Sequence, residues 1–376
     1  MALVADLPAH YNPWDDLSRS AKPPRRLIII GDVHGQLSAL QALLHKTHHD
    51  STTDHVILVG DLVTKGPESV GVVQLAIDLG ASAVRGNHED KVLRLPITNN
   101  TTAAVEATAS TASNPNPGDH TAVARALSPA QRAWLSSLPL ILRIPTSPTT
   151  TTAPAPWNAA ELIVVHAGLV PGVPLAKQDP WAVMNMRSLV YDHHHHHHHH
   201  HKTNNDTSSA PPSPKPIDGR EGEPWSEAWN RAQNAIPREE DRVVVIYGHD
   251  AHAGPQTDLH VRVKAAGEDT DDTGDEEDDG DEDNESDSIT DEIASNEKKK
   301  KGGGNHHDEE KKKKKKDKKE KKKKKKKDKK KNKKTGIRYA FGLDSGCGHG
   351  RQLTALVLEA NRHRIVQVEC EKSLVC

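Results

Sequence analysis

The chain has 376 residues, of which only 3% are aromatic, so aliphatic side chains and alanine must supply most of a buried core. The formal net charge of −2 hides a strong local separation, because acidic residues gather between Glu268 and Glu292 and lysines between Lys298 and Lys334. The charge of the whole chain therefore excludes no class of partner, and the core must be smaller than the chain length suggests.

Cysteine usage and hydropathy limit the expected location. Cys347, Cys370 and Cys376 show neither the spacing of a disulfide framework nor a zinc-ribbon pattern. No apolar run reaches membrane-spanning length, and the N-terminus lacks the apolar core of a signal peptide. These features predict a chain without structural disulfides in a reducing compartment, the cytoplasm or the nucleus, with no membrane contact.

Ordered elements are expected to begin after an N-terminal tail of residues 1–24. The segment from Arg25 to Leu95 has short apolar runs, glycine-rich turns and helical patterns, which are typical of stacked β-α units. Ser128 and Gln131 have the spacing of a capping box, with Pro129 at the first helical position, and predict a helix through Trp134. Later strands are predicted at Leu138–Ile144, Glu161–Val165, Arg338–Leu343, Leu353–Leu358 and Ile365–Glu369.

Low-complexity segments are expected to interrupt a single domain of residues 25–372 as disordered insertions at about 98–118, 146–159, 193–222 and 266–334. The lysine run Lys311–Lys331 has two interpretations. It is a solvated repeat, or it raises the local concentration of a polyanion in a salt-dependent way. The histidine run His193–His201 carries no ligand geometry, so we leave it outside the site.

The strongest functional signal lies where apolar strands end. Five apolar runs each lead into a glycine and a side chain that can bind a metal, and these runs are Leu27–Ile30, Val56–Val59, Ala81–Arg85, Leu162–Val165 and Val243–Tyr247. The side chains that follow them are Asp32, His34, Asp61, Asn87, His166 and His249. One such motif is weak evidence, because an Asp or His after a strand is usually a turn residue or a structural histidine. Their repetition in chain order predicts one metal site at the carboxyl ends of the strands.

These motifs resemble a known family. Gly31–Gly35, Gly60-Asp61, Gly86–Glu89, His166–Gly168 and Gly248-His249 are similar to the signature of calcineurin-like metallophosphatases in the phosphoprotein-phosphatase superfamily. Markers of its ApaH-like branch are Lys65–Ser69, a predicted helix at Asn185–Leu189, Pro224-Trp225 with Trp229, and Leu343–Cys347. That branch includes bacterial diadenosine-tetraphosphate hydrolases, eukaryotic ApaH-like enzymes and a fungal zinc-dependent endopolyphosphatase.

The resemblance implies an α/β fold, a four-layer α/β-β/α sandwich, with two divalent metal ions. Asp32, His34 and Asp61 would hold the first ion, and Asp61 would bridge to the second. The second ion would also be held by Asn87, His166 and His249. Zn²⁺, Mn²⁺ and Fe all suit such ligands, and the resemblance favours zinc. Together the ions would clamp phosphoryl oxygens and activate a bridging water for in-line attack on phosphorus.

Two arginines match phosphate-clamping positions of the family. Arg85 and Arg187 are expected to bind phosphate oxygens with their guanidinium groups, and the alternative is an ordinary ion-pair arginine at each position. Trp181 and Trp225 are expected to be packing residues rather than platforms on which a substrate stacks.

His88 is the expected general acid, which would protonate the leaving oxygen. Protein phosphatases of the family carry Asp-Arg-Gly where this chain has Thr64, Lys65 and Gly66, and that Asp orients the catalytic imidazole. Without a carboxylate partner, His88 should be less basic. A serine alkoxide needs a strong proton donor to leave, whereas a phosphate leaves with little help. The substitution therefore favours phosphoanhydride substrates.

Three functions are compatible with these residues. The favoured one is hydrolysis of inorganic polyphosphate, as by an endopolyphosphatase, or of nucleotide anhydrides. The second is a protein serine/threonine phosphatase, which would keep the same metals but fits Thr64 and Lys65 poorly. The third is a polyanion-binding scaffold with an idle domain, an interpretation that the complete set of ligands does not favour.

Overall fold

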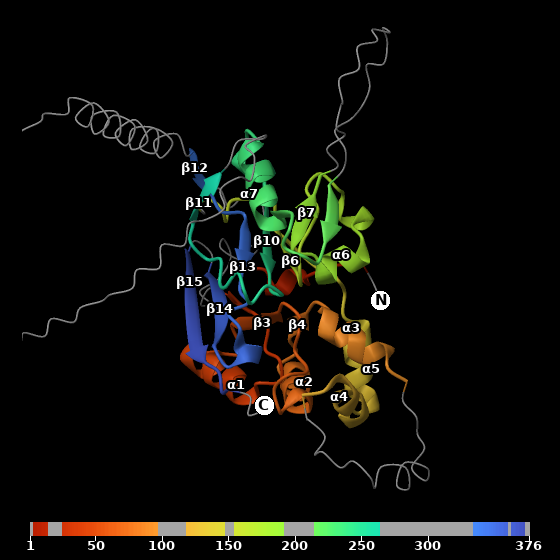
Figure 1. Ribbon diagram of the computed structural model, residues 1–376. Helices are drawn as coiled ribbons and strands as arrows, with labels where there is room; N and C mark the ends of the chain where they lie inside the picture. Colours follow the sequence, from red (N-terminus) through yellow and green to blue (C-terminus); the bar gives the residue numbers. More distant parts are fainter. Residues whose placement is uncertain are drawn as a thin grey trace, which may run out of the picture. The chain divides into compact units, whose positions relative to one another are not determined.

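The computed structural model describes residues 3–13, 25–96, 118–146, 154–191, 214–263, 334–359 and 362–372. Two five-stranded sheets form the centre of the described fold (Figure 1). The first sheet contains, in spatial order, β1 (Val4–Asp6), β5 (Ile141–Pro145), β6 (Glu161–Val165), β10 (Val243–Tyr247) and β13 (Ala340–Gly342). The second contains β15 (Arg362–Glu369), β14 (Gln352–Glu359), β2 (Arg26–Ile30), β3 (Asp54–Leu58) and β4 (Ser82–Ala83).

Side chains of β2 alternate between two cores because successive residues of a strand face opposite sides of the sheet. Leu27 and Ile29 join a core that both sheets share, whereas Ile28 and Ile30 join a core between the second sheet and its helices. The sheets therefore face one another across the first core. This packing explains why the β2 run is apolar at every position from Leu27 onward.

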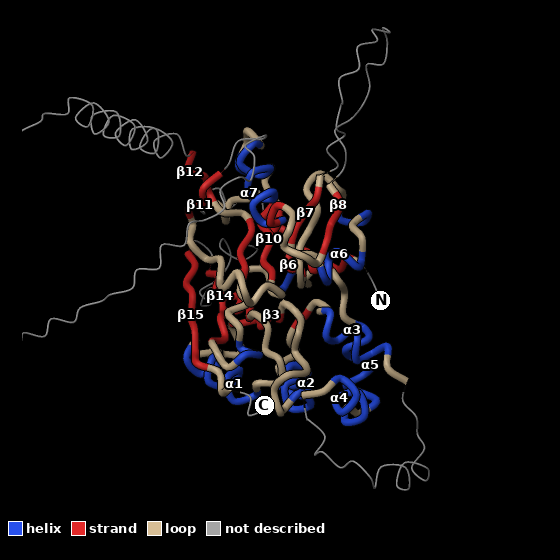
Figure 2. The backbone as a smooth tube through the Cα atoms, viewed as in Figure 1, coloured by secondary structure: helices blue, strands red, loops and turns tan. Residues whose placement is uncertain are grey.

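Helices cover the outer faces of both sheets, as Figure 2 shows in blue. The second sheet packs against α1 (Leu37–Lys46), α2 (Ser69–Asp78), α3 (Asn87–Arg94), α4 (His120–Ala126) and α5 (Pro129–Ser137). The first sheet packs against α6 (Pro180–Asn185) and α7 (Trp225–Ala235). The predicted α/β-β/α sandwich is confirmed. The predicted capping box of α5 is also confirmed, because Ser128 and Gln131 each accept a hydrogen bond from the other's backbone N–H.

Two small sheets complete the described fold. One contains β8 (Lys215–Ile217), β7 (Ser188–Val190) and β9 (Glu223–Pro224), and the other contains β11 (His260–Val263) and β12 (Lys334–Ile337). The predicted helix at Asn185–Leu189 is wrong, because α6 ends at Asn185 and β7 follows. Residues of β7 form a strand because they pair with β8, about 27 residues further along the chain. The segment is too short for its hydrophobic periodicity to distinguish a helix from a strand.

The predicted N-terminal tail is wrong for Val4–Asp6. β1 pairs in parallel with β5, Leu7 is buried, and Asp6 forms an ion pair with Arg143 of β5. A strand of this length carries almost no periodic signal by itself, so the sequence predicts a tail here. The edge of a sheet formed by distant segments holds these residues in place.

The predicted insertions lie mostly outside the described residues, so their disorder stays a prediction. The described parts of two of them are ordered instead. Trp157 and Ala159 are buried in the core that the sheets share, and β8 lies inside the expected insertion at 193–222. The histidine run His193–His201, the acidic residues Glu268–Glu292 and the lysine run Lys311–Lys331 lie outside the described residues, and the polyanion contact of the lysines also stays a prediction.

A disulfide joins Cys347, in the 3₁₀ turn η4 (Cys347–His349), to Cys370, which follows β15. The expectation of no structural disulfide is therefore wrong. Antiparallel pairing of β14 with β15 places Gln352 opposite Glu369 and so brings the two cysteines together, a proximity that spacing in the sequence cannot reveal. The cytoplasmic or nuclear location was predicted partly from the expected absence of a structural disulfide. It is no longer supported by that observation and stays a prediction.

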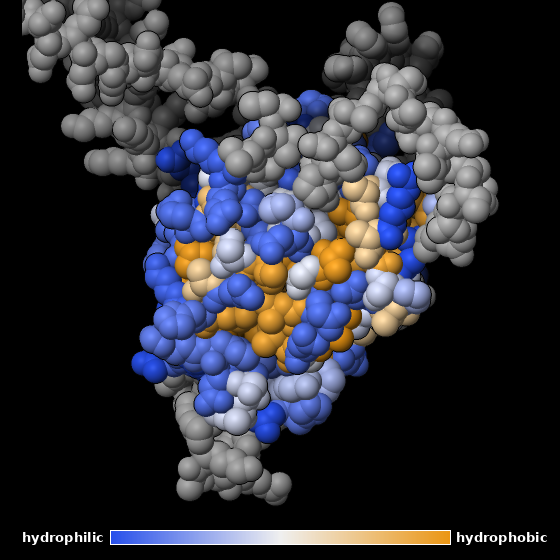
Figure 3. All heavy atoms as spheres, turned by 90° about the horizontal axis from the view of Figure 1, so that it is seen from below, coloured by the Kyte–Doolittle hydropathy of each residue, from blue (hydrophilic) through white to orange (hydrophobic). Residues whose placement is uncertain are grey.

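Hydropathy of the described elements adds two observations. None of the helices in the described ranges is long and apolar enough to cross a membrane. Figure 3 shows the molecule from below, where apolar residues gather in the middle of the face and polar residues surround them.

Candidate metal and phosphate site

The carboxyl ends of five strands meet at one site, as the sequence predicts. β2, β3 and β4 of one sheet and β6 and β10 of the other lead into it. Two groups of side chains there have potential ligand atoms within 4.8 Å of one another, and Asp61 belongs to both. A pocket of about 120 Å³ opens between them, lined by His34, Asp61, Lys65, Asn87, His88, Arg187, His249, Ala251, His252, Asp344 and His349.

Three histidines each use one ring nitrogen on a backbone carbonyl. His34 Nδ1 lies 3.3 Å from Val63 O, and His166 Nδ1 lies 3.0 Å from Val59 O. His249 Nε2 lies 3.0 Å from the carbonyl of Asn185. A carbonyl can only accept, so each of these nitrogens carries a proton, and the opposite nitrogen of each ring is the one available as a metal ligand. This arrangement is the one that fixes a metal-binding tautomer.

Burial keeps two of these rings neutral. It lowers the pKa of His34 and the pKa of His249 well below the ordinary histidine value, and it is the largest cause for both groups. A metal ligand must be an unprotonated imidazole, so these side chains suit a metal ion at neutral pH.

Backbone strain gathers at the same residues. His34, Asp61 and His249 have φ values of 48°, 50° and 69°, in the left-handed region that non-glycine residues rarely adopt. Each such residue costs about 1–3 kcal/mol and persists only where its surroundings hold it. The coincidence of strain with potential ligands indicates a functional site.

Asp61 lies at the centre of the cluster. Its Oδ1 is 3.3 Å from His166 Nε2 and its Oδ2 is 3.6 Å from His34 Nε2, so its two oxygens face different histidines. The Asn87 side-chain amide at the start of α3 lies 3.0 Å from His166 Nε2. This geometry suits a carboxylate that bridges two ions.

Asp32, which follows β2, is held by the backbone that follows β10 of the other sheet. Both of its carboxylate oxygens accept from His249 N at 3.1 Å. Gly248 permits this contact, because a Cβ there would lie 2.0 Å from Asp32 Oδ1. Burial, followed by the charges of Asp344 and Asp61, raises the pKa of Asp32 well above its usual value. A buried group of carboxylates with neutral imidazoles is a donor set that divalent cations fit.

His88 lines the pocket with a hydroxyl instead of a carboxylate at its Nδ1. Its Nε2 lies 3.8 Å from Asp61 Oδ2, and its Nδ1 is in hydrogen-bond contact with the hydroxyl of Thr64. The ring of His120 stacks on the His88 ring at 4.9 Å between centroids. Burial is the main cause that lowers the pKa of His88 to about 4, and Asp61 opposes this effect.

The two predicted phosphate clamps differ in position. Arg187 lines the pocket, where its Nη1 donates to Asp218 O at 3.1 Å. The structure does not bring Arg85 to the pocket. The Arg85 guanidinium is buried and donates to the carbonyls of Leu135 and Ser136 at the end of α5. It joins two elements of the fold instead of facing a substrate.

Four polar pocket residues were given no role from the sequence. Lys65, His252, Asp344 and His349 lie in the wall beside the predicted ligands, and Lys65 Nζ is 2.8 Å from His34 Nε2. Asp344 follows the apolar β13, so the same signal that identified the other strand ends could have found it.

Glu89 is a further residue whose role was missed. Its buried carboxylate accepts hydrogen bonds from the backbone N–H groups of Asp61, Leu62, Val63 and Gly86. It thereby ties the loop after β3 to the start of α3. No sequence pattern reveals these partners, because three of them lie more than twenty residues away.

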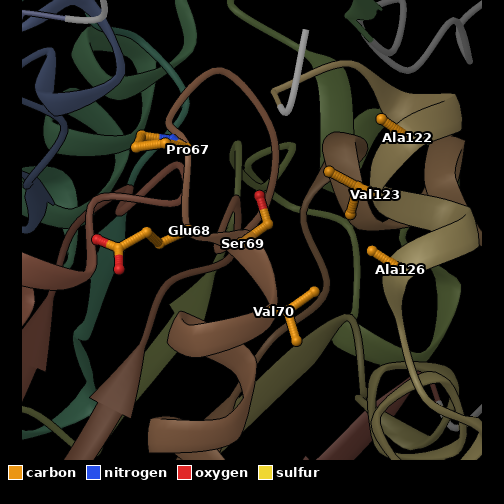
Figure 4. A pocket seen from close by; sticks show the side chains of 7 residues that line it. All are labelled: Pro67, Glu68, Ser69, Val70, Ala122, Val123 and Ala126. Atoms are coloured by element: carbon orange, nitrogen blue, oxygen red, sulfur yellow. The ribbon is translucent and has the colours of Figure 1, made fainter. Parts of the chain in front are cut away.

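A larger pocket of about 270 Å³ lies between the start of α2 and α4 (Figure 4). Its walls are formed by Pro67, Glu68, Ser69, Val70, Ala122, Val123 and Ala126. Only Glu68 and Ser69 offer polar side chains, and the Ser69 hydroxyl already accepts from Thr64 N at 2.8 Å. Larger size without convergent polar groups does not make a catalytic site.

Of the two tryptophans that were predicted to be packing residues, one is buried and one is exposed. Trp225 is buried, and its ring contacts Tyr247 at 4.7 Å between centroids, which confirms the predicted packing. Trp181 is instead 43% exposed, so the structure does not bear out a packing role for it.

Known proteins resemble this chain in part. A serine/threonine-protein phosphatase 1 of Salmonella typhimurium is 40% identical over 73 residues, which cover 19% of this chain and 34% of that protein. A symmetrical bis(5'-nucleosyl)-tetraphosphatase of Photorhabdus laumondii is 46% identical over 63 residues, covering 16% and 23%. The matched regions therefore span about a third or less of either relative's length.

A solved structure of a candidate diadenosine tetraphosphatase has the same fold. It is 23% identical, with a TM-score of 0.52, and the comparison covers 98% of this chain and 99% of that one. The family model described as calcineurin-like phosphoesterase matches residues 25–258, which contain all six predicted ligands. With the converging strand ends and the histidine tautomers, this match shows that the chain belongs to the calcineurin-like phosphoesterase family.

Proposed function

We propose that this protein is a two-metal hydrolase of phosphoric anhydrides, acting on inorganic polyphosphate or on nucleotide polyphosphates. Asp32, His34 and Asp61 would hold the first ion, and Asp61 would share the second. Asn87, His166 and His249 would also hold that second ion. When bound, the ions polarise the phosphoryl group and supply an activated water as the nucleophile. Zn²⁺, Mn²⁺ and Fe suit the ligands, with zinc favoured by the family resemblance.

The surroundings of His88 are the observation that favours phosphoanhydride over phosphoester substrates. Thr64, a neutral hydroxyl, contacts its Nδ1, and a pKa of about 4 leaves the ring uncharged at neutral pH. An uncharged imidazole is a poor proton donor, so the reaction must rely on a leaving group that departs with little protonation. A terminal phosphate or a nucleotide meets this condition, whereas a serine alkoxide does not.

Basic groups around the pocket support a polyanionic substrate. Arg187 lies at one side, and Lys65, His252 and His349 lie in the wall. Arg187 is suited to two oxygens of one phosphate, and Lys65 acts as a point charge. The imidazoles of the exposed His252 and His349 can donate N–H groups to phosphates next to the reacting one.

The named activities of two relatives leave a second candidate function. One relative is named as a serine/threonine-protein phosphatase and the other as a tetraphosphatase. A protein phosphatase would use the same ligands but would need a stronger proton donor than His88 beside Thr64. The idle-scaffold alternative has less support, because the predicted ligands converge.

A matrix of metals and substrates tests the proposal. Metal-free protein is supplied with Zn²⁺, Mn²⁺, Fe²⁺ or Mg²⁺ and assayed on polyphosphate, diadenosine tetraphosphate and a phosphoserine peptide. We expect kcat/KM to be on the order of 100-fold higher for the anhydrides, since that is the scale of general-acid assistance. A higher value for the phosphopeptide would establish the protein-phosphatase function instead.

Replacing His88 should separate the two bond types further. His88→Ala should slow hydrolysis of an alkyl phosphomonoester by about tenfold and leave hydrolysis of polyphosphate nearly unchanged, because the neutral ring is a weak proton donor and only the ester depends on proton donation. Single-turnover rates on both substrates measure this difference. His120→Ala is the matched control, since it removes the stacked ring but leaves His88 in the pocket. Equal losses on both substrates in His88→Ala would count against the general-acid role.

A further inference from the structure

Asp344 lies at the end of a sixth strand that leads into the site. β13 runs parallel to β10, with Gly342 opposite Tyr247. Continuing this register by two residues places Asp344 level with His249, one of the proposed ligands. The carboxyl ends of parallel strands share one edge of a sheet, so the position is equivalent to that of the other ligands.

Close contact between β2 and β13 brings Asp344 beside Asp32. A Cβ on Gly31 would lie 2.4 Å from Leu343 O, so only glycine allows the two strand ends to approach this closely. The next residues along the two strands are Asp32 and Asp344. Asp344 is only 5% exposed.

The Asp344 side chain is fixed toward the pocket. Its Oδ1 accepts from Gly346 N at 2.9 Å, and Gly346 has a φ of 79°, which forms the tight turn behind the carboxylate. The carboxylate lines the pocket together with His34 and Asp61. This local turn fixes the orientation of the side chain, and its place in the pocket lining is what points to binding.

Asp32, Asp61 and Asp344 are thus three buried aspartates at the ends of strands that lead into the site. Buried charges of like sign repel one another unless a cation or a proton offsets them. On the basis of the proposed function, we propose that Asp344 supplies a further carboxylate oxygen to the ion that Asp32, His34 and Asp61 hold.

This assignment makes the two ion positions chemically different. The first receives oxygen from Asp32, Asp61 and Asp344 and nitrogen from His34 alone. The second receives two imidazoles, from His166 and His249, with oxygen from Asn87 and Asp61. Carboxylate-rich positions suit harder cations such as Mn²⁺, and imidazole-rich positions suit Zn²⁺. Asp344 therefore determines metal preference at the first position.

Titration of metal-free protein with Mn²⁺, followed by the electron paramagnetic resonance signal of free Mn²⁺, tests the assignment without a substrate. Wild type should bind two ions. Asp344→Asn should keep one and weaken the other by at least about tenfold, the scale on which metal-site partners act. The control Asp250→Asn removes the same charge from a carboxylate that Arg220 already holds, and it should bind both ions normally.

A second measurement separates metal binding from a structural role. The amide oxygen that Asp344→Asn introduces can still accept from Gly346 N, and the substitution removes one of the neighbouring negative charges. The metal-free variant should therefore unfold at the same urea concentration as wild type or at a higher one. Unchanged affinity for both ions, or a lower urea midpoint with both ions weakened equally, would overturn the assignment. A wild-type protein that binds no Mn²⁺, Zn²⁺ or Fe²⁺ would overturn the proposed metal centre itself.

Discussion

Asp61→Asn should abolish most activity and release bound metal. The carboxylate of Asp61 faces His166 with one oxygen and His34 with the other, and it is the ligand that we propose both ions share. An amide offers a single neutral oxygen and cannot bridge them with the same charge. We expect kcat on polyphosphate to fall by at least about 100-fold and metal content to drop below two ions per chain, as measured by elemental analysis after dialysis.

Asp54→Asn is the matched control for this change. Asp54 is also a buried aspartate, but it pairs with Arg26 at the start of β2, at the opposite end of the strand from the site. Its loss should lower stability and leave the metal content unchanged, because the pair contributes to folding alone. If Asp61→Asn kept both ions and full activity, the proposed bridge would be wrong.

Glu89→Ala should be among the most destabilising single changes in the described fold. Removing the carboxylate leaves the four backbone N–H groups that it binds without an acceptor, at a buried position. Each unsatisfied buried donor costs about 1–3 kcal/mol, so the free energy of unfolding should fall on the order of 4 kcal/mol. Urea unfolding with a chelator present measures this loss without the contribution of bound metal.

Glu89→Gln and Glu240→Ala bracket the expected result. Glutamine keeps one oxygen acceptor but points an NH₂ group at backbone donors. The free energy of unfolding of Glu89→Gln should therefore lie between those of wild type and Glu89→Ala. Glu240 is an exposed residue that pairs with Arg238, and its replacement should leave the unfolding midpoint unchanged. A Glu89→Ala protein with the wild-type midpoint would mean that water replaces the carboxylate at little cost.

The positions of the ligands could be predicted from the sequence because their signal is local. An apolar run that ends in a glycine and an Asp, Asn or His needs only its immediate neighbours to be recognised. The convergence of these runs then follows from a rule that holds for α/β sheets in general. Asp32, His34, Asp61, Asn87, His166 and His249 surround one site for this reason.

Arg85 and Lys65 show where local reasoning reaches its limit. Arg85 comes just before the Asn87 motif, and Lys65 comes just after the Asp61 motif. The sequence offers no way to decide which of the two faces the pocket. The end of α5 supplies the carbonyls that hold Arg85 away from the pocket, and the turn after Asp61 directs Lys65 into it. Those partners come from distant segments and depend on helix packing.

Amino-acid order by itself determined the α/β class, most strand ends and the ligand types at those ends, because hydrophobic periodicity and strand-end chemistry act over a few residues. Tertiary structure alone decided the β1–β5 pairing, the strand β7, the Cys347–Cys370 disulfide and the position of Asp344. Each of these depends on the register between segments that are distant along the chain. Register is set by the packing of complete sheets against one another, which no short stretch of sequence contains.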